Sequence, residues 1–182
     1  MFLADKIDPD TCPAEHLITI GQPAGTDGST VHTLIANCPP LDTNSVYCNL
    51  LQCTHFADTC AIARHTGNII GFVSAYIPPT RQDTLFVWQV AIHETMRGKG
   101  LGKVLIQNIL GRETCRNVRY LQTTITAGNN SSWRMFRSLA QGIGAKTTHT
   151  THFERDAHFG GRHETEFMLT IGPFHIPQDN EP

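Results

Sequence analysis

Apolar residues recur at helical spacing in four segments of the chain. In each segment they lie three or four positions apart, so that one face of the predicted helix is apolar. Residues that favour helix N-caps precede these segments, and glycine or proline follows most of them. The predicted helices span approximately residues 27–38, 43–54, 101–110 and 130–143.

Seven shorter segments have the composition of strands. The central one, Thr84–His93, has almost no polar face, which predicts burial on both sides of a sheet. Thr66-Gly67-Asn68 separates two others and predicts a hairpin. Helices and strands therefore mix in an α/β (α+β) domain around one central sheet. The predicted strands are His16–Ile20, Thr59–His65, Ile69–Ile77, Thr84–His93, Arg119–Thr126, Lys146–Phe153 and Glu166–Ile171.

A length of 182 residues fits one domain, which we expect to span residues 16–174. Residues 1–15 are polar and aperiodic and predict a flexible N-terminal arm, whereas residues 175–182 form a short C-terminal tail. Residues 154–165 are charged and contain glycine, which predicts a mobile loop before the last strand.

The composition argues against several classes of protein. Lys and Arg number 14 against 16 Asp and Glu, and the net charge of −2 does not suit a protein that binds nucleic acid through its phosphates. No apolar run reaches the ~20 residues of a membrane span, and the N-terminus lacks a secretory signal. The six cysteines form no C-x-x-C pair, which predicts reduced thiols and a cytoplasmic protein.

A glycine-rich segment after the central strand, RGKGLGK, predicts an anion site. It opens the third predicted helix, where unpaired N–H groups and the helix dipole attract negative charge. Arg97, Lys99 and Lys103 add positive charge. A P-loop would need Gly in place of Arg97 and Ser or Thr in place of Val104, and a dinucleotide fingerprint would need Gly in place of Lys103. Both motifs are excluded.

The same segment contains R-x-x-G-x-G, as Arg97, Gly100 and Gly102, directly after a strand. It resembles the pyrophosphate-binding signature of the GNAT superfamily of N-acetyltransferases, with an ordinary glycine turn as the alternative. Over residues 16–174 the chain also resembles the diaminobutyrate acetyltransferase family of ectoine biosynthesis. The segments that carry this resemblance are LDTNSVYCNLL, CTHFADTC, GFVSAYIPP, DTLFVWQVAIH, TTITAGNNSSWRMFRSLA, HFGGRHETE and IGPF.

This resemblance implies a GNAT fold, with a mixed, mostly antiparallel sheet that is flanked by helices and splayed at Thr84–His93. It also implies acetyl-coenzyme A as cosubstrate, and a backbone N–H of Val90 that stabilises the oxyanion. Many GNAT enzymes carry a tyrosine where Phe136 stands, and a phenyl ring cannot protonate a thiolate. The residues implied to bind the cofactor are Gln89, Val90, Ala91, Ile92, Arg97, Gly98, Lys99, Gly100, Leu101, Gly102, Lys103, Asn129 and Phe136.

The implied acceptor is L-2,4-diaminobutyrate, whose 4-amino group would attack directly in a ternary complex. Glu166 and His163 are the implied groups that bind or deprotonate this amine, although charged loop residues are commonly only solvated. On sequence alone, Asp42 could instead cap a helix and Trp88 could lie in the core. The residues implied to bind the acceptor are Asp42, Asn44, Ser45, Tyr47, Trp88, Gln89, His163 and Glu166.

Two alternative functions stay open at this point. The chain could acetylate another small amine or amino acid, or it could be a non-catalytic acyl-coenzyme A sensor, which the missing tyrosine at position 136 would permit. The spacing of the histidines matches no zinc-ligand pattern, so we expect no metal. Family resemblance and a charged content of only 16% predict a homodimer, with no nucleic-acid or membrane partner.

Overall fold

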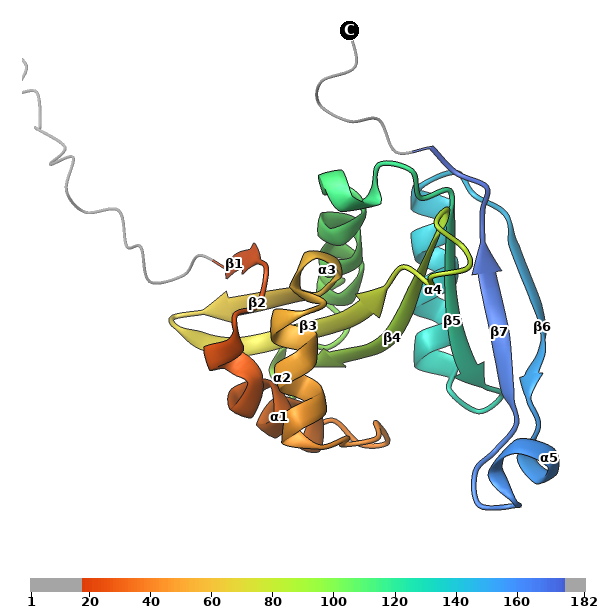
Figure 1. Ribbon diagram of the computed structural model, residues 1–182, viewed down its shortest axis with the longest axis horizontal. Coiled ribbons are helices and arrows are strands. Elements are labelled where there is room, and N and C mark those ends of the chain that lie inside the picture. The colour runs from red at the N-terminus through yellow and green to blue at the C-terminus, as the bar shows by residue number, and fades with distance from the viewer. Residues whose placement is uncertain (1–17, 176–182) are drawn as a thin grey trace, which may run out of the picture.

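The computed structural model describes residues 18–175, which form a seven-stranded sheet with helices on both faces (Figure 1). The strand order is β1-β2-β3-β4-β5-β7-β6. Only β4 and β5 pair in parallel, and every other pair in the described part of the chain is antiparallel. This confirms the predicted mixed, mostly antiparallel sheet. The predicted arm at residues 1–15, Cys12 and most of the tail at 175–182 lie outside the described residues.

The elements follow the predicted segments closely. The strands are β1 (Ile18–Gly21), β2 (Ala61–His65), β3 (Asn68–Tyr76), β4 (Thr84–Ile92), β5 (Tyr120–Thr126), β6 (Thr147–Phe153) and β7 (Glu166–Ile171). The α-helices are α1 (Gly28–Ala36), α2 (Val46–Thr54), α3 (Leu101–Leu110), α4 (Asn130–Gly142) and α5 (Arg155–Phe159). Short 3-10 turns are η2 (Gly25–Asp27), η3 (Ala57–Thr59), η4 (Glu94–Met96) and η5 (Glu113–Cys115).

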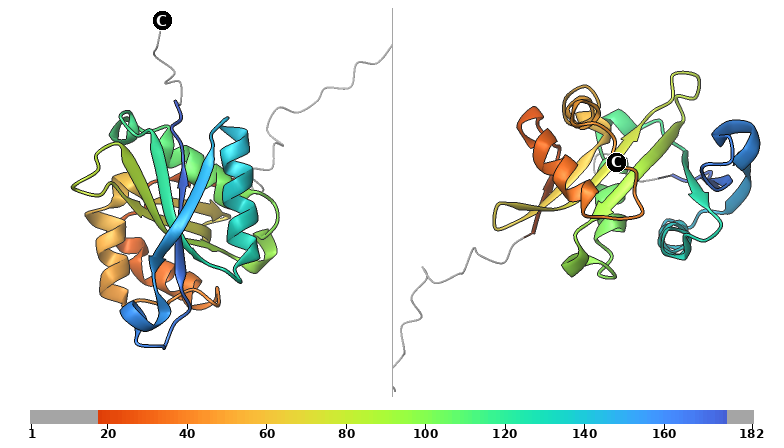
Figure 2. Two further views of the ribbon diagram at one scale, coloured as in Figure 1. Left: turned by 90° about the vertical axis from the view of Figure 1, so that its right-hand side faces the viewer. Right: turned by 90° about the horizontal axis from the view of Figure 1, so that it is seen from below.

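The helices divide between the two faces of the sheet, α1 and α2 on one side and α3 and α4 on the other (Figure 2, right). Alternation along the central strands feeds a separate core on each side. In β3, Phe72 packs with α1, whereas its neighbour Val73 packs with α3. In β4, Leu85 belongs to the α3 core and Ala91 to the α1 core. The central strands are therefore apolar on both faces, as their sequence predicts.

The sheet splays between β4 and β5, which confirms the expected opening. Only Thr84–Phe86 of β4 pair with β5, opposite Tyr120–Gln122. Beyond that point β5 continues beside β7 as far as Thr126, while β4 stays with β3. The two strands therefore diverge toward their carboxyl ends (Figure 1). A bulge at Trp88, which has no partner in β3, coincides with the start of the divergence.

Two local predictions need correction. Helix α2 begins at Val46 and is capped by Ser45, whose Oγ accepts from the Cys48 N–H at 3.1 Å, so neither Asp42 nor Thr43 is its cap. The segment predicted as a loop contains the five-residue helix α5, which extends past the ends of β6 and β7 (Figure 1). Its sequence, RDAHF, is too short and too polar to show helical periodicity.

Candidate active site

A cleft of about 610 Å³ opens beside the carboxyl end of β4. It is lined by the loop between α1 and α2, the end of β4, the segment that leads into α3 and the first turns of α4. These are the segments that the divergence of β4 from β5 leaves uncovered. The glycine-rich segment that the sequence singles out therefore borders this cleft.

Glycine is required at positions 98 and 100 because of the backbone conformation there, and not because a side chain would clash with a neighbour. Their φ angles are 75° and 80°, in the left-handed region, and a Cβ at either position would meet no atom within 4 Å. Gly100 stands directly before α3, and its carbonyl accepts from the N–H groups of Lys103 and Val104. The N–H groups of Leu101 and Gly102 precede any helical acceptor, so this turn suits an anion.

Gly102 fulfils a different condition, because it lies where three elements meet. A Cβ there would stand 2.8 Å from Met135 Sδ and 3.1 Å from Val90 Cγ1. The absence of a side chain thus lets the first turn of α3 approach both β4 and α4. This close packing forms the inner end of the cleft.

Cationic side chains surround the anion-binding turn and are held by hydrogen bonds. Arg97 Nε donates to the Ile92 carbonyl at 3.0 Å, and Lys103 Nζ donates to Ser138 Oγ at 3.1 Å. Arg134 of α4 also lines the cleft. Lys99, in contrast, does not line it, and its ammonium group lies 3.9 Å from Met96 Sδ. Positive charge therefore comes from two helices and not from the glycine segment alone.

The backbone of β4 presents N–H groups to the side from which β5 has diverged. His93 N–H donates to the Ile70 carbonyl of β3 at 2.9 Å. Because N–H directions alternate along a strand, the N–H groups of Val90 and Ile92 point away from β3, and both residues line the cleft. The backbone of Ala91 points into the β3–β4 ladder instead. This geometry favours Val90 over Ala91 as an oxyanion donor.

Helix α4 contributes its N-cap and its polar face. Asn129 lines the cleft, and its side chain accepts from the Ser132 N–H at 3.1 Å. Phe136 differs from the expectation, because it is 2% exposed and belongs to the α3 core, and it does not line the cleft. Arg134 and Ser138, which line the cleft, stand two positions before and two positions after Phe136 and so on the opposite side of the helix.

On the other face of β4, hydrogen bonds join three of the predicted acceptor residues. Gln89 Nε2 donates to the Asp42 carbonyl at 2.6 Å, and Asn44 Nδ2 donates to Gln89 Oε1 at 3.0 Å. Asp42 is exposed, so its carboxylate is available to solvent. Trp88 and Tyr47 are 47% and 69% exposed. The alternative interpretations of Asp42 as a helix cap and of Trp88 as a core residue are therefore wrong.

His163 and Glu166 form a second group at the start of β7. His163 Nε2 lies 3.9 Å from Glu166 Oε1, and the Glu166 side chain is only 21% exposed. His163 Nδ1 lies 2.8 Å from the Glu164 carbonyl. A carbonyl only accepts, so we assign the proton of the neutral ring to Nδ1, which leaves the Nε2 lone pair facing the carboxylate.

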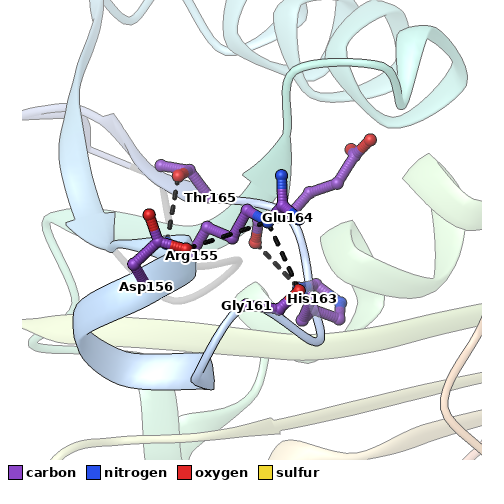
Figure 3. A network of polar contacts seen from close by, with 6 residues as sticks. All are labelled: Arg155, Asp156, Gly161, His163, Glu164 and Thr165. Atoms are coloured by element: carbon purple, nitrogen blue, oxygen red, sulfur yellow. Dashed lines mark hydrogen bonds and ion pairs between the residues drawn. The ribbon is translucent and has the colours of Figure 1, made fainter.

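The segment that carries His163 is closed by its own polar contacts (Figure 3). The Arg155 N–H donates to Thr165 Oγ1 at 3.2 Å, and Arg155 Nε donates to the Gly161 carbonyl at 3.3 Å. Asp156 lies 3.9 Å from the same guanidinium. These contacts join both ends of α5. The α5 segment and the α1–α2 loop lie at the same end of the molecule, where β4 and β5 diverge (Figures 1 and 2).

Comparison with known proteins identifies the family. The acetyltransferase (GNAT) family matches residues 31–140. L-2,4-diaminobutyric acid acetyltransferase from Methylotuvimicrobium alcaliphilum is 44% identical over 162 residues, which are 89% of this chain and 94% of that protein. The protein of that name from Bordetella parapertussis is 48% identical over 156 residues, 85% of this chain and 84% of its own length. The chain belongs to the GNAT acetyltransferases.

A solved relative within this family has the same architecture. Diaminobutyrate acetyltransferase from Paenibacillus lautus, in complex with L-2,4-diaminobutyric acid and coenzyme A, aligns with a TM-score of 0.84 at 36% sequence identity. The alignment covers 89% of this chain and 98% of that one. The GNAT fold expected from the R-x-x-G-x-G segment is thereby confirmed.

Several residues that line the cleft were not predicted from the sequence. Arg134 and Ser138 lie on α4, and residues 38–41 reach the cleft from the α1–α2 loop. The only sequence signal for Arg134 was a cation in the first turns of a helix next to the expected cofactor site. Nothing in the pattern of residues 38–41 indicates that this loop folds over the end of β4.

Two structural observations concern other classes of ligand. Among residues 18–175, no three His, Cys, Asp or Glu side chains gather where they could hold a metal ion. None of the helices in that part of the chain is long and apolar enough to cross a membrane.

Proposed function

We propose that this GNAT acetyltransferase transfers the acetyl group of acetyl-coenzyme A to the 4-amino group of L-2,4-diaminobutyrate. The product is N4-acetyl-L-2,4-diaminobutyrate, an intermediate of ectoine biosynthesis. The observation that carries the proposal is the 44–48% identity to L-2,4-diaminobutyric acid acetyltransferases over nearly the whole of both chains. The Paenibacillus lautus relative, which binds this amino acid and coenzyme A, supports it through its fold.

The cleft beside β4 suits the cofactor. Acetyl-coenzyme A supplies an activated thioester and a pyrophosphate. The N–H groups at the start of α3, with Arg97 and Lys103 beside them, match two adjacent phosphates in charge. Arg134 of α4 adds a third positive charge to the lining of the cleft. The Val90 N–H, directed away from β3, stabilises the negative charge that develops on the thioester oxygen.

The acceptor is a small molecule with two ammonium groups and one carboxylate. Asp42 and Glu166 supply the negative charge that attracts the ammonium groups, and the exposed ring of Trp88 offers a cation–π surface. Attack requires a neutral amine. His163 accepts the proton at Nε2, and the neighbouring Glu166 carboxylate stabilises the resulting imidazolium.

The leaving group needs little assistance. An ordinary alkyl thiol has a pKa of about 8.5, so a thiolate can leave and take a proton from water. No tyrosine stands at position 136, and Phe136 is buried away from the cleft. We therefore assign no general acid to the protein.

We also infer that the enzyme acts as a homodimer in the cytoplasm. Every residue of β6 is exposed in the single chain, and Phe153 at its end is 37% exposed, which supports a protein contact there. Five cysteines in the described part of the chain are free thiols, as expected in a reducing compartment.

The reaction is tested by thiol release from acetyl-coenzyme A with a panel of diamines and amino acids. We expect L-2,4-diaminobutyrate to be preferred, and NMR of the product to show the acetyl group on the 4-amino nitrogen. Preference for another amine, or acetylation of the 2-amino group, would contradict the proposal.

The role of Glu166 is tested with Glu166→Ala. We expect a rise of at least tenfold in the diaminobutyrate KM, a comparable fall in kcat, or both, because the variant removes negative charge beside His163. Glu164→Ala is the matched control, since the Glu164 side chain is exposed and only its carbonyl contacts His163. Equal kinetics for the two variants would remove Glu166 from the site.

A further inference from the structure

The bulge in β4 determines which way Gln89 faces. Val87 pairs with Ala75 and Gln89 pairs with Ser74, so Trp88 is an extra residue without a partner in β3. In an unbroken strand Gln89 would share a face with Val87, which packs in the α3 core. The extra residue reverses this alternation. Gln89 therefore points to the α1–α2 side, as Ala91 does.

Both ends of the Gln89 amide are bonded within the chain. The side chain is buried, with 6% of the residue exposed. Its Nε2 donates to the Asp42 carbonyl at 2.6 Å, and its Oε1 accepts from Asn44 Nδ2 at 3.0 Å. Asn44 Nδ2 also lies 3.3 Å from the Asp42 carbonyl, so the three residues form a closed ring of hydrogen bonds. We call this ring the amide clasp.

The amide clasp joins an irregular loop to β4. Residues 42–45 have no helix or strand structure, and Asn44 adopts a left-handed φ of 58°. Directly after the clasp, Ser45 caps α2, and Tyr47 lies in the first turn of that helix. The clasp thus connects the bulged strand to the segment that carries the Asp42 carboxylate and the Tyr47 ring.

These contacts indicate a different role for Gln89 from that of a ligand. One N–H of the amide and one lone pair of its oxygen are already bonded to the loop, and the side chain is 6% exposed, so Gln89 is better placed to hold the loop than to contact a bound molecule. We propose that Gln89 is a positioning residue, which holds the α1–α2 loop on the β4 bulge so that Asp42 and Tyr47 are set for the acceptor. The inference deepens the proposed function, because it takes that acceptor to be diaminobutyrate.

The decisive variant is Gln89→Leu, which keeps the size of the side chain and removes both hydrogen-bonding ends. We expect the diaminobutyrate KM to rise at least tenfold and the acetyl-coenzyme A KM to rise clearly less, because the clasp holds residues 42–44 directly and residues 38–41 of the cofactor cleft only through the chain. Gln122→Leu is the matched control, because Gln122 on β5 also makes a side-chain hydrogen bond, to Thr170 Oγ1 at 3.0 Å, away from the loop. It should leave both KM values unchanged.

A double-mutant cycle shows whether the ring acts as one unit. Asn44→Ala should raise the diaminobutyrate KM in the same selective way. The double variant should then be no worse than Gln89→Leu alone, because residues of one network are not additive. Fully multiplicative effects would contradict the clasp.

A readout without turnover separates this inference from the proposed function. Hydrogen–deuterium exchange of a peptide that covers residues 38–45 should be at least fivefold faster in Gln89→Leu and unchanged in Gln122→Leu. If the wild type does not acetylate diaminobutyrate, the proposed function fails, and the exchange result still decides whether the clasp holds the loop. Wild-type exchange in Gln89→Leu, or an unchanged diaminobutyrate KM beside an active wild type, overturns the inference.

If Gln89→Leu does not fold, Gln89→Glu gives the same decision. A protonated Glu can still donate to the Asp42 carbonyl, whereas an ionised one places negative charge against it. We expect the diaminobutyrate KM of Gln89→Glu, relative to wild type at the same pH, to increase as pH rises through the titration of the new carboxyl. A ratio that stays near one at every pH overturns the inference.

Discussion

At the scale of single residues, one backbone angle decides what position 100 can be. Gly100 has a φ of 80°, and a Cβ there would meet no neighbouring atom, so the strain of a substitution comes from the left-handed conformation alone. That conformation costs an L-residue roughly 1–2 kcal/mol. Because Gly100 also shapes the anion-binding turn, strain and ligand affinity should change together.

We expect Gly100→Ala to lower the free energy of unfolding by about 1 kcal/mol and to weaken acetyl-coenzyme A binding at least fivefold. Urea denaturation and titration calorimetry measure the two effects. Gly142→Ala is the control, because its Cβ also meets open space but its φ lies outside the left-handed region. An equal response of both variants would show that φ is not the cause.

Ser74 of β3 carries a buried hydroxyl group without a hydrogen-bond partner among residues 18–175, so a substitution there could stabilise the fold. Ser74 is 1% exposed, and its Oγ has no hydrogen-bond partner in the described part of the chain. A buried hydroxyl without a partner costs about 1–3 kcal/mol of desolvation. Ser74→Ala should therefore leave the free energy of unfolding unchanged or raise it by up to about 1 kcal/mol. A loss of more than about 1 kcal/mol by urea denaturation would mean that the hydroxyl is bonded.

At the scale of elements, the end of α3 is tied to η3 by one guanidinium. Arg112 Nη1 donates to the carbonyls of Ala57, Asp58 and Cys60 at 3.2, 3.0 and 2.7 Å. Burial lowers the pKa of Arg112 from its usual value, but the group stays charged at neutral pH. Its bonds join the segment after α3 to carbonyls that lie more than 50 positions earlier in the chain.

Arg112→Met should lower the free energy of unfolding by about 2–3 kcal/mol, because it leaves these carbonyls without a charged donor. Arg116→Met serves for comparison. Arg116 pairs with Glu113 at 2.8 Å, but both side chains are more than half exposed, and such pairs contribute less than about 1 kcal/mol. Thermal or urea unfolding of the two variants measures the difference. Equal losses would contradict the structural role of Arg112.

The elements with strong apolar periodicity could be read from sequence, and the others could not. The hairpin of β2 and β3 has its turn at Thr66 and Gly67, as predicted, because both positions adopt left-handed φ angles that the turn requires. Helix α5 could not be predicted, because five residues with only Ala157 and Phe159 apolar show no helical period. Its order comes from contacts such as Arg155 with Thr165, ten positions away.

The residues of the candidate site also fall into two groups, those that local sequence spacing predicts and those that only the fold brings together. Arg97, Gly100 and Gly102 lie in one continuous segment, so spacing alone is enough to single them out. The bond between Gln89 and Asp42 joins residues 47 positions apart and depends on a one-residue bulge. No local pattern encodes which face a strand residue takes after a bulge. The location of Phe136 likewise depended on the rotation of α4, which family resemblance did not fix.

At the scale of the whole molecule, buried thiols occur in the cores on both faces of the sheet. Cys53 and Cys60 belong to the α1 core and Cys115 to the α3 core. Burial raises the pKa of Cys60 to about 12 and the pKa values of Cys53 and Cys115 to about 11, from a usual value of 9.0. Each thiol therefore stays protonated in the folded chain at a pH where the unfolded chain ionises.

This difference predicts a loss of stability in alkali. Below pH 9 the thiols are protonated in both the folded and the unfolded chain, so they do not change the free energy of unfolding with pH. Between about pH 9 and pH 11 the unfolded state binds fewer protons, so the free energy of unfolding falls as pH rises. For Cys60 the slope approaches about 1 kcal/mol per pH unit. Urea denaturation at several pH values from 7.5 to 10.5 measures it.

Alanine variants assign the slope to particular thiols. Cys60→Ala and Cys115→Ala should each flatten the dependence above pH 9, one from each core, whatever their stability at pH 7.5. Burial and the nearby Asp42 carboxylate also raise the pKa of Cys48, but this thiol lies partly exposed outside both cores, so Cys48→Ala should flatten the slope less than either core variant. If only Cys60→Ala flattens the curve, the α3 core must admit water or open before global unfolding. Equal flattening would show that the two cores, although separated by the sheet, unfold together.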